Sequence, residues 1–582
     1  MTQREEPALD VQPAPAVAGC KPYVIPPKAD FIDLPLGNTE RVLVSAEEAE
    51  SLERILAGCS AKTVVGYPSA VDLEALLAER LGVELEQVLV TAGADEALER
   101  ALEAVLIPGR ELIAPAPTFE MIPIYAKLTG ADVRSVPWLE GPYPADAVLA
   151  AITEKTAAVT IVTPNNPTGA VASLEDMCRI AETAPQVLVL VDMAYGEFAD
   201  SDYTETLLRY PNVVMARTLS KAWGMPGLRV GYAVGDARVI AWMRGASGPY
   251  TVSRLSLAVA EARIREGDES LRVYVDRVRA ERAKLTSLIA ELGGRPLPSQ
   301  ANFILARFEN AQWVRDGLAG LGIGSRVFPN KESLRDAFRI SCPGDENAFA
   351  RLDKAFRAVL KPQAILFDLD GVLADVSKSY RRSIIETAKS FGVDITLDDV
   401  SASKAEGHAN NDWDVTQRLL ARRGIELTLE DVTARFESIY QGTEATPGLR
   451  STESLMVDRT WLASLKEHYP MAIVTGRPRA DAHRFLTEQG ILALFDAVVC
   501  MEDAELKPNP APVVLALNQL KVETAWMLGD TPDDLVAARG AGVVPIGVVP
   551  PGEQPSRVMK TLTDAGAACV LERTEQLTER LP

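Results

Sequence analysis

The sequence predicts two α/β units in tandem, on the basis of three observations. First, 582 residues are too many for one hydrophobic core. Second, between about residues 60 and 240, helical patterns such as VDLEALLAERLG alternate with apolar runs such as VLVLVD, as in a sheet covered by helices. Third, another series of apolar runs begins at AILFDLDGV and continues through MAIVTGR and TAWMLGD. Polar residues end these runs, where open α/β sheets bind ligands.

The composition favours a folded protein without a nucleic-acid or membrane partner. Hydrophobic residues make up 47% and charged residues 24% of the chain, which are ordinary globular values. The net charge of −21 would repel a phosphate backbone. No apolar run is long enough for a membrane span, and the acidic N-terminus does not resemble a signal peptide. Six scattered cysteines fit reduced thiols. We therefore expect a cytoplasmic protein, with a flexible tail over residues 1–20.

The boundary between the units is predicted at Lys361-Pro362, where the helical pattern ENAFARLDKAFRAVL ends. The first unit would then span residues 21–361 and the second residues 362–582. Between about residues 376 and 469, helical patterns replace the apolar runs. This change predicts a helical insert within the second unit.

The segment RTLSKAWGMPGLRVGY resembles the lysine motif of fold-type I aminotransferases, and most closely the histidinol-phosphate aminotransferase branch. The resemblance implies a pyridoxal-phosphate (PLP)-dependent transferase fold, with a large α/β domain at about 60–250. A small α+β domain would comprise about 251–361 and the N-terminal segment. Lys221 would join PLP through its amine and move a proton on the substrate. Thr218 and Arg229 would bind the cofactor phosphate.

Two further segments match the family's contacts to the cofactor ring. Asp192 ends the run VLVLVD, where a buried carboxylate can keep the pyridine nitrogen protonated. Tyr195 and Asn166, the latter in TPNNPTG, match contacts to the phenolic oxygen, although a plain turn also explains NNPTG. Phe119 would stack on the ring or be an ordinary core residue.

Other matches concern the cofactor phosphate, the substrate and a second subunit. TAGADEAL opens a predicted helix, so the amides of Ala94 and Asp95 could bind the cofactor phosphate. Tyr67 matches a tyrosine that reaches the cofactor of the other subunit, which implies a homodimer. Arg339 in AFRISCPG would bind the amino-acid carboxylate with both arms of its guanidinium. The remaining substrate-contact matches are Asn38, Asn302 and Arg326.

Two of these substrate matches leave alternatives open. Arg326 falls where some relatives bind a substrate phosphate, but a solvated arginine explains it equally. Asn38 lies in LGNTER, which lacks the proline of the family's corresponding segment.

The segment ILFDLDGVLAD resembles the first motif of haloacid-dehalogenase-type phosphatases. The resemblance implies a Rossmann-like fold whose helical insert is a cap. Asp368 would attack phosphorus to form an aspartyl-phosphate, and Asp370 would protonate the leaving oxygen and then activate water. The acid at position 370 favours phosphate esters over carbon–halogen or carbon–phosphorus bonds.

The later motifs of this family follow in order. Thr475 in IVTGR would bind phosphate oxygens, and Lys507 in ELKPNP would offset charge at the phosphoryl group. Mg²⁺ suits an all-oxygen site, and its expected ligands are Asp368, Asp370, Asp530 and Asp534. In the insert, EGHANNDWD makes His408, Asn411 and Trp413 candidate substrate contacts. A capped helix start with a packing tryptophan explains the same residues.

The two resemblances together predict a bifunctional enzyme. Its first reaction would transfer an amino group from glutamate to imidazole-acetol phosphate, and its second would hydrolyse the resulting histidinol phosphate to histidinol. One alternative is an aminotransferase and phosphatase acting on another phosphorylated or keto substrate in specialised metabolism. The other is a catalytically silent PLP-binding regulator.

Overall fold

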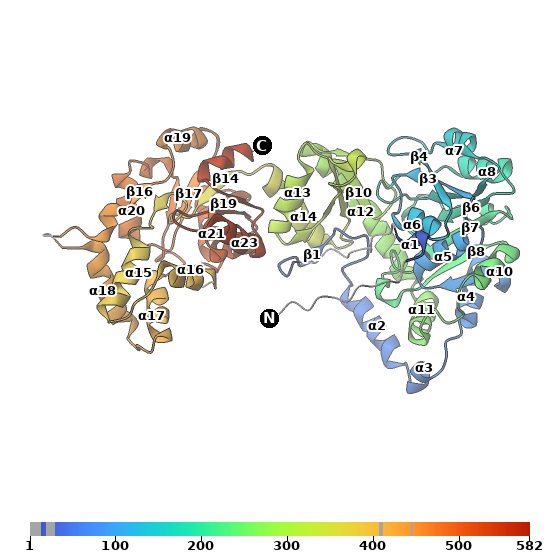
Figure 1. Cartoon of the computed structure of the whole chain (residues 1–582), viewed down its shortest axis with the longest axis horizontal. Coiled ribbons are helices and arrows are strands. Elements are labelled where there is room, and N and C mark those ends of the chain that lie inside the picture. The colour runs from blue at the N-terminus through green and yellow to red at the C-terminus, as the bar shows by residue number, and fades with distance from the viewer. Residues whose placement is uncertain (1–12, 19–28, 407–410, 444–445, 582) are drawn as a thin grey trace. The chain divides into compact units, whose positions relative to one another are not determined.

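The computed structural model describes residues 13–18, 29–406, 411–443 and 446–581. By internal contacts the chain divides into two compact units (Figure 1). Of the described residues, the first unit comprises 13–18, 36–308 and 328–349, and the second comprises 29–35, 309–327, 350–406, 411–443 and 446–581. Two short segments that precede residue 350 in the chain, one near the N-terminus and one at residues 309–327, therefore group with the C-terminal unit. The boundary between the two units that the sequence predicts at Lys361-Pro362 stays a prediction.

The first unit is built on a seven-stranded sheet in the order β2-β8-β7-β6-β5-β3-β4. Its pairings are parallel except those of β8, which is antiparallel to both neighbours. Every residue of β5, β6 and β7 is buried, which is why these strands are continuous apolar runs in the sequence. The strands are β2 (Val88–Thr91), β3 (Glu111–Ala116), β4 (Asp132–Pro137), β5 (Thr156–Val162), β6 (Leu188–Asp192), β7 (Val213–Thr218) and β8 (Gly231–Gly235).

Helices cover both faces of this sheet because strand residues alternate between two hydrophobic clusters. In β2, Val88 and Val90 belong to one cluster and Leu89 to the other. The first cluster includes residues of α4 (Val71–Leu81), α8 (Leu174–Thr183) and α11 (Arg254–Glu266). The second includes residues of α5 (Gly93–Glu103), α6 (Met121–Leu128) and α10 (Ala237–Gly245).

A second layer of the first unit positions substrate-binding candidates. Its long helix is α12 (Asp268–Glu291), and β10 (Phe303–Arg307) pairs antiparallel with β9 (Arg295–Pro296) and β13 (Ala337–Ser341). The other helices of the first unit are α1 (Pro15–Ala18), α2 (Ala46–Ala57), α3 (Ala61–Val65), α7 (Ala145–Ala151) and α9 (Thr204–Leu207).

The second unit contains a six-stranded parallel sheet in the order β18-β17-β14-β19-β20-β21. The strands are β14 (Ala364–Phe367), β17 (Met471–Val474), β18 (Ala497–Val499), β19 (Ala525–Gly529), β20 (Val544–Val548) and β21 (Cys569–Leu571). The helices along this sheet are α19 (Arg459–His468), α20 (Arg479–Glu488), α21 (Ala511–Leu520), α22 (Pro532–Gly540) and α23 (Pro555–Asp564). The two sheets confirm the predicted α/β class.

Four α-helices of the described residues, between β15 (Ala374–Asp375) and β16 (Ser454–Leu455), form the insert, which we call the cap (Figure 1). They are α15 (Tyr380–Ser390), α16 (Leu397–Ala405), α17 (Asp412–Arg422) and α18 (Leu429–Gln441). The chain leaves the sheet through β15 (Ala374–Asp375) and returns through β16 (Ser454–Leu455), and these two strands pair antiparallel. The two crossings therefore lie side by side.

Tryptophans pack the sheet of the second unit against the segments that precede it. The Trp526 ring lies 4.9 Å from the ring of Trp313 in α13 (Ala311–Gly320). Its Nε1 donates to the Ala358 carbonyl in α14 (Glu346–Leu360), at 2.7 Å. Nearby, β1 (Leu34–Pro35) pairs in parallel with β11 (Ile323–Gly324).

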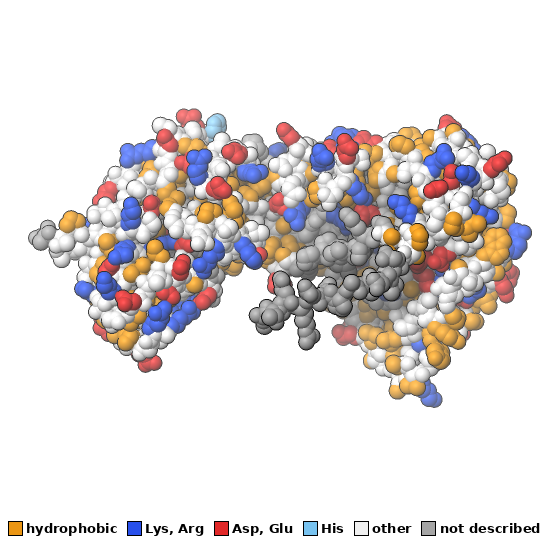
Figure 2. All heavy atoms as spheres, in the orientation of Figure 1, with side chains coloured by type: hydrophobic (Ala, Val, Ile, Leu, Met, Phe, Trp, Pro, Cys, Tyr) orange, Lys and Arg blue, Asp and Glu red, His pale blue; other side chains and the backbone are white. Residues whose placement is uncertain are grey.

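Two surface properties bear on possible partners. None of the helices in the described part of the chain combines the length and apolar character that a bilayer crossing needs. On the face shown in Figure 2, basic and acidic side chains are interspersed.

Two candidate active sites

The first site forms around Lys221, three residues after the end of β7. Its Nζ donates a hydrogen bond to Thr39 Oγ1 at 2.7 Å. The same hydroxyl lies 2.7 Å from the hydroxyl of Tyr195. The amine is therefore linked to the predicted phenol through Thr39, a residue that the motifs did not indicate.

Asp192, the last residue of β6, is buried. The Ala194 amide donates to its Oδ1 at 2.9 Å. Burial raises the pKa of Asp192 to about 7, while the Ala194 amide and the Lys221 ammonium act in the opposite direction. A buried carboxylate of this kind fits the cationic nitrogen of a pyridinium ring, because the positive charge would favour its ionised form.

A cradle of donors lies where β7, β8 and the start of α5 meet. Arg229 Nη1 donates to Ser220 Oγ at 3.2 Å, and Nη2 donates to Asp95 Oδ2 at 3.1 Å. Thr218 Oγ1 donates to the same Ser220 oxygen at 3.0 Å. A Cβ on Gly93 would lie 2.5 Å from Arg229 Nη2, so glycine permits the guanidinium to approach the first turn of α5.

This cradle suits an anion. A helix N-terminus, two hydroxyls and a guanidinium together match phosphate oxygens. Ala94 and Asp95 lie in the first turn of α5, as the sequence predicted. With the buried carboxylate and the amine, the residues fit PLP.

Arg339 lies on β13 and is buried. Its Nη1 donates to Asn166 Oδ1 at 2.6 Å, and its Nη2 donates to the Gly37 carbonyl at 2.9 Å. The guanidinium carbon lies 5.2 Å from the centre of the Phe303 ring. Two predicted residues 173 positions apart are thus in direct contact.

The N-terminal segment is fastened to this layer by its backbone. Ser341 Oγ donates to the Asn38 carbonyl at 2.6 Å, and Asn302 Nδ2 donates to the Thr39 carbonyl at 3.0 Å. The Asn38 side chain instead donates to Glu40 Oε1 at 3.2 Å. These bonds place the Thr39 hydroxyl next to Lys221.

Three predicted residues have described surroundings that differ from this cluster. Phe119 is half-buried and packs against the cluster of α5 and α6. Tyr67 is 82% exposed and stacks on Tyr250. Arg326 lies in β12 (Arg326–Val327), in the second unit. Their roles stay predictions.

The second site forms around Asp368, the residue directly after β14. Lys507 Nζ donates to Asp368 Oδ1 at 2.7 Å, to Asp534 Oδ1 at 2.5 Å and to the Val474 carbonyl at 3.0 Å. Burial raises the pKa of Asp368 well above its ordinary value, although the Lys507 charge opposes this shift. Neighbouring carboxylates raise it further.

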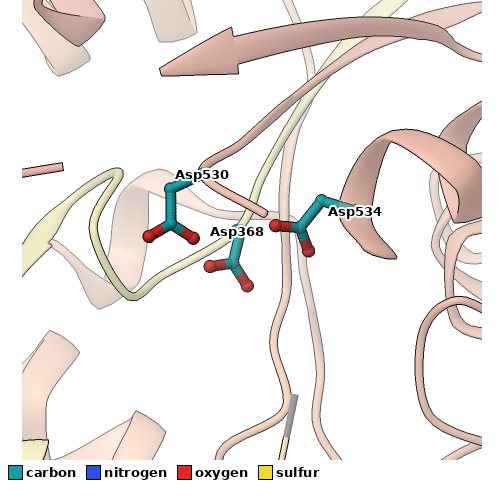
Figure 3. Close-up of side chains that lie close together, drawn as sticks. All are labelled: Asp368, Asp530 and Asp534. Carbon is teal, nitrogen blue, oxygen red and sulfur yellow. The ribbon is translucent and has the colours of Figure 1, made fainter. Parts of the chain in front are cut away.

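Three carboxylates converge at this point (Figure 3). Ligand oxygens of Asp368, Asp530 and Asp534 all lie within 4.8 Å of one another. Thr531, the N-cap of α22, donates from its amide and hydroxyl to Asp534 Oδ2. Gly371, at φ 73°, leaves room for Asp530, since a Cβ there would lie 2.3 Å from Oδ2. Buried, mutually repelling carboxylate oxygens fit Mg²⁺, which would relieve that repulsion.

Asp370 is held differently from the other three predicted metal ligands. Its Oδ1 accepts from Arg477 Nε at 2.7 Å and lies 2.5 Å from Arg477 Nη2. Arg477 also donates to Glu453 Oε2 at 2.9 Å. Arg477 is the last residue of the segment IVTGR, from which only Thr475 was predicted as a site residue, so this motif is the signal that could have indicated Arg477.

A cavity opens over these groups and is partly lined by the cap. Its lining residues are Asp368, Asp370, Tyr380, Asn411, Asp412, Trp413, Gly476, Arg477, Pro478, Met501, Asp530 and Thr531. Asn411 caps α17 by accepting from the Trp413 amide at 3.0 Å. Asn411 therefore caps a helix, and both Asn411 and Trp413 line the cavity, while their contact with substrate stays a prediction. His408 lies outside the described residues. Thr475 is buried beside the cavity, and its hydroxyl accepts from the Arg477 amide at 3.2 Å.

Comparison with known proteins relates the chain to three kinds of relative. It is 45% identical over 225 residues to an imidazoleglycerol-phosphate dehydratase from Phytophthora nicotianae, covering 36% of this chain and 50% of that protein. The chain thus spans about half the length of this relative. An aromatic amino acid aminotransferase from Corynebacterium glutamicum is 37% identical, covering 50% of this chain and 83% of the relative. A histidinol-phosphate aminotransferase from Thermoanaerobacter pseudethanolicus is 32% identical, covering 54% and 88%.

Solved structures agree on the fold. The crystal structure of histidinol-phosphate aminotransferase from Sinorhizobium meliloti with PLP superposes with a TM-score of 0.50 at 24% identity. The superposition covers 56% of this chain and 92% of that one. The family described as aminotransferase class I and II matches residues 33–349, and the haloacid dehalogenase-like hydrolase family matches residues 365–548. The chain therefore belongs to the aminotransferase class I and II family and carries a haloacid dehalogenase-like hydrolase domain in its C-terminal part.

Proposed function

We propose that the chain is a bifunctional enzyme that transaminates imidazole-acetol phosphate with glutamate and hydrolyses the product, histidinol phosphate. The observation that carries the proposal is the presence of two sites in one chain. The first site contains the Lys221 amine, the buried Asp192 carboxylate and the anion-binding cradle. The second site contains Lys507 and the clustered carboxylates of Asp368, Asp530 and Asp534. An aminotransferase that makes a phosphate ester would directly supply the phosphatase.

In the first site, bound PLP supplies an electron sink for charge that develops on the substrate. Lys221 Nζ, beside the Thr39 hydroxyl, moves the proton at the substrate Cα. Arg339 binds the substrate carboxylate, and Asn166 already orients its guanidinium. Asp192 holds the charge on the ring nitrogen from its buried position.

In the second site, an oxygen of Asp368 attacks phosphorus while Asp370 protonates the leaving oxygen. Asp370 then takes a proton from the water that cleaves the aspartyl-phosphate. Lys507 offsets negative charge at Asp368 throughout. Asp368, Asp530 and Asp534 would hold Mg²⁺, which supplies further charge stabilisation at the phosphoryl group.

The substrate proposal rests on the comparisons and on the chemical order of the two reactions. One aminotransferase relative acts, by its name, on histidinol phosphate, and the dehydratase relative bears the name of another imidazole phosphate. The similarity to an aromatic amino acid aminotransferase favours a second candidate, in which the first site takes a different keto acid. A catalytically silent PLP-binding regulator is the third.

The test incubates the protein with histidinol phosphate, with and without Mg²⁺. We expect Mg²⁺-dependent release of phosphate. We also expect histidinol phosphate to change the absorbance of the bound PLP, and 2-oxoglutarate to restore it. If neither response exceeds background, the histidinol phosphate proposal fails. Conversion of aromatic keto acids alone would support the second candidate, and a PLP absorbance that does not respond to glutamate would support the regulator.

We also propose a homodimer through the aminotransferase part, in which Tyr67 reaches the cofactor of the other subunit. Its 82% exposure leaves the side chain available for such a contact.

A further inference from the structure

Arg477 is the most enclosed cation of the phosphatase site. Its side chain is 1% exposed, and its guanidinium carbon lies 4.8 Å from the Tyr380 ring centre and 5.3 Å from that of Phe485. Two carboxylates neutralise it, Asp370 on one side and Glu453 on the other. Because a buried charge is stable only with its partners, the guanidinium and both carboxylates form one unit.

The partners of Arg477 come from different parts of the fold. Asp370 follows β14, on the sheet side of the cavity. Tyr380 begins the first helix of the cap, and Glu453 directly precedes β16. These two residues therefore mark the two crossings between the sheet and the cap, which are themselves paired as β15 and β16.

Glu453 is further tied to the last cap helix. Tyr440, in α18, donates from its hydroxyl to Glu453 Oε1 at 3.0 Å. The Tyr440 and Tyr380 rings lie 4.3 Å apart. Burial raises the pKa of Glu453, and the Arg477 charge opposes that shift. Any displacement of the cap that moves Glu453 would thus act directly on the guanidinium.

We propose that Arg477 is a positioning residue that couples the cap to Asp370, so that the placement of the cap on the substrate sets the orientation of the Asp370 carboxylate. The inference rests on the proposed role of Asp370. Through Nε and Nη2, Arg477 fixes one oxygen of Asp370 at the edge of the cavity. Through Nη1, it donates a hydrogen bond to Glu453, which also accepts one from Tyr440 of the cap. A misplacement of a catalytic group by about 1 Å can slow a reaction by about 10²-fold.

The test compares two phosphate esters that differ in their need for a proton donor. Propyl phosphate releases an alkoxide that must be protonated, whereas 4-nitrophenyl phosphate releases a stable phenolate. For Arg477→Lys, which keeps the charge but loses the fork, we expect kcat/KM for propyl phosphate, which reports the steps up to release of the alcohol, to fall roughly 10-fold or more. We expect kcat/KM for 4-nitrophenyl phosphate to fall less than about 3-fold, because this quantity reports the steps up to departure of the leaving group, and the phenolate leaves without a proton from Asp370.

Two comparison variants decide what a loss means. Glu453→Gln keeps the shape of the cap contact and should give the same selective loss. Arg479→Lys makes the same change at a half-exposed arginine that is paired with Asp503. It should leave the rates of hydrolysis of both esters unchanged. Circular dichroism would check that each full-length variant is folded.

Asp370→Asn separates failure of this inference from failure of the proposed function. One outcome is that Asp370→Asn slows hydrolysis of propyl phosphate selectively, while Arg477→Lys slows hydrolysis of both esters equally. In that case Arg477 has only a structural role, and the coupling is refuted. If Asp370→Asn itself shows no selectivity, the proposed acid role of Asp370 fails, and the inference fails with it. Selective losses in Asp370→Asn, Arg477→Lys and Glu453→Gln would support the coupling.

Discussion

The Thr39 hydroxyl lies between two groups that handle protons in the first site, and this position yields a prediction. Thr39→Val would keep the shape of the side chain but remove the hydrogen bond from Lys221 Nζ. A hydrogen bond to a charged group contributes about 1.5–3 kcal/mol. We therefore expect the half-reaction of the PLP form with glutamate to slow by about 10- to 100-fold, as measured by stopped-flow absorbance.

Thr286→Val provides the matched control, because Thr286 is exposed on α12 and its hydroxyl bonds only to a helix carbonyl in the described structure. It should react at the wild-type rate. An unchanged rate in Thr39→Val would show that Thr39 merely packs beside the amine.

Asp192 gives a prediction about stability and pH in the protein without PLP. The pKa of Asp192 is about 7 when folded, against an ordinary 3.8. Between these values the folded state holds a proton that the unfolded state has lost, so the free energy of unfolding falls as pH rises. The slope from this one group is about 1.4 kcal/mol per pH unit.

Asp192→Asn removes this dependence. Its Tm relative to wild type should therefore increase between pH 5 and pH 8, in calorimetry of the transition that responds to added PLP. A difference in Tm that stays constant with pH would contradict the burial argument.

Residues of the sites divide into those that the sequence could predict and those that it could not. Asp192 and Asp368 end apolar runs, and Lys221 lies in a long segment that resembles a family motif, so these three positions followed from local sequence. Thr39 and Arg477 act through partners 182 and 107 positions away in the chain. Such pairings depend on how strands and loops meet in three dimensions, and a single sequence carries no local signal for them.

Secondary-structure elements also divide into those that the sequence predicts and those that it does not. The long buried strands β5, β6 and β14 appear as apolar runs because both of their faces are covered. The pairing of the two-residue strands β1 and β11, 289 positions apart between Leu34 and Ile323, has no such pattern. The grouping of residues 28–35 and 309–327 with the C-terminal unit was therefore not predictable.

The short helix α3 offers a prediction for the proposed dimer. It exposes Val64 and Val65 to 74% and 85%, and Tyr67 follows at 82%. Apolar side chains grouped at a surface in this way favour a protein interface. Val65→Glu should therefore weaken the dimer, and light scattering should detect a mass near that of a single chain at micromolar concentration.

Val273→Glu is the control for this experiment, because Val273 is a 44% exposed valine elsewhere, on α12. It should keep the wild-type mass. A dimer that survives Val65→Glu would place the interface away from α3, and a monomeric wild type would refute the dimer.

At the scale of the whole molecule, each unit has its own sheet and its own candidate site. The seven-stranded sheet supports Lys221 and Asp192, and the six-stranded sheet supports Asp368 and Asp530. The two sheets also contribute to different hydrophobic clusters. Residues of the seven-stranded sheet lie in two clusters, and residues of the six-stranded sheet lie in a third. The contacts described for Lys221 and Asp192 and those described for Asp368 and Asp530 therefore come from separate units.

Independent sites predict reciprocal losses in two single variants of the full chain. Lys221→Ala removes the amine of the first site and should abolish glutamate-dependent transamination, while phosphate release stays within about 2-fold of wild type. Asp368→Asn removes the nucleophile of the second site and should do the reverse, with a loss of about 10³-fold or more in phosphate release. Chelation of Mg²⁺ by EDTA should reproduce the Asp368→Asn pattern in wild type, because the three clustered carboxylates belong to the second site alone. Both activities are measured on the same preparation, and circular dichroism verifies its folding. Loss of both activities in either folded variant would mean that the sites depend on each other, and the two-site account would have to be replaced by a coupled one.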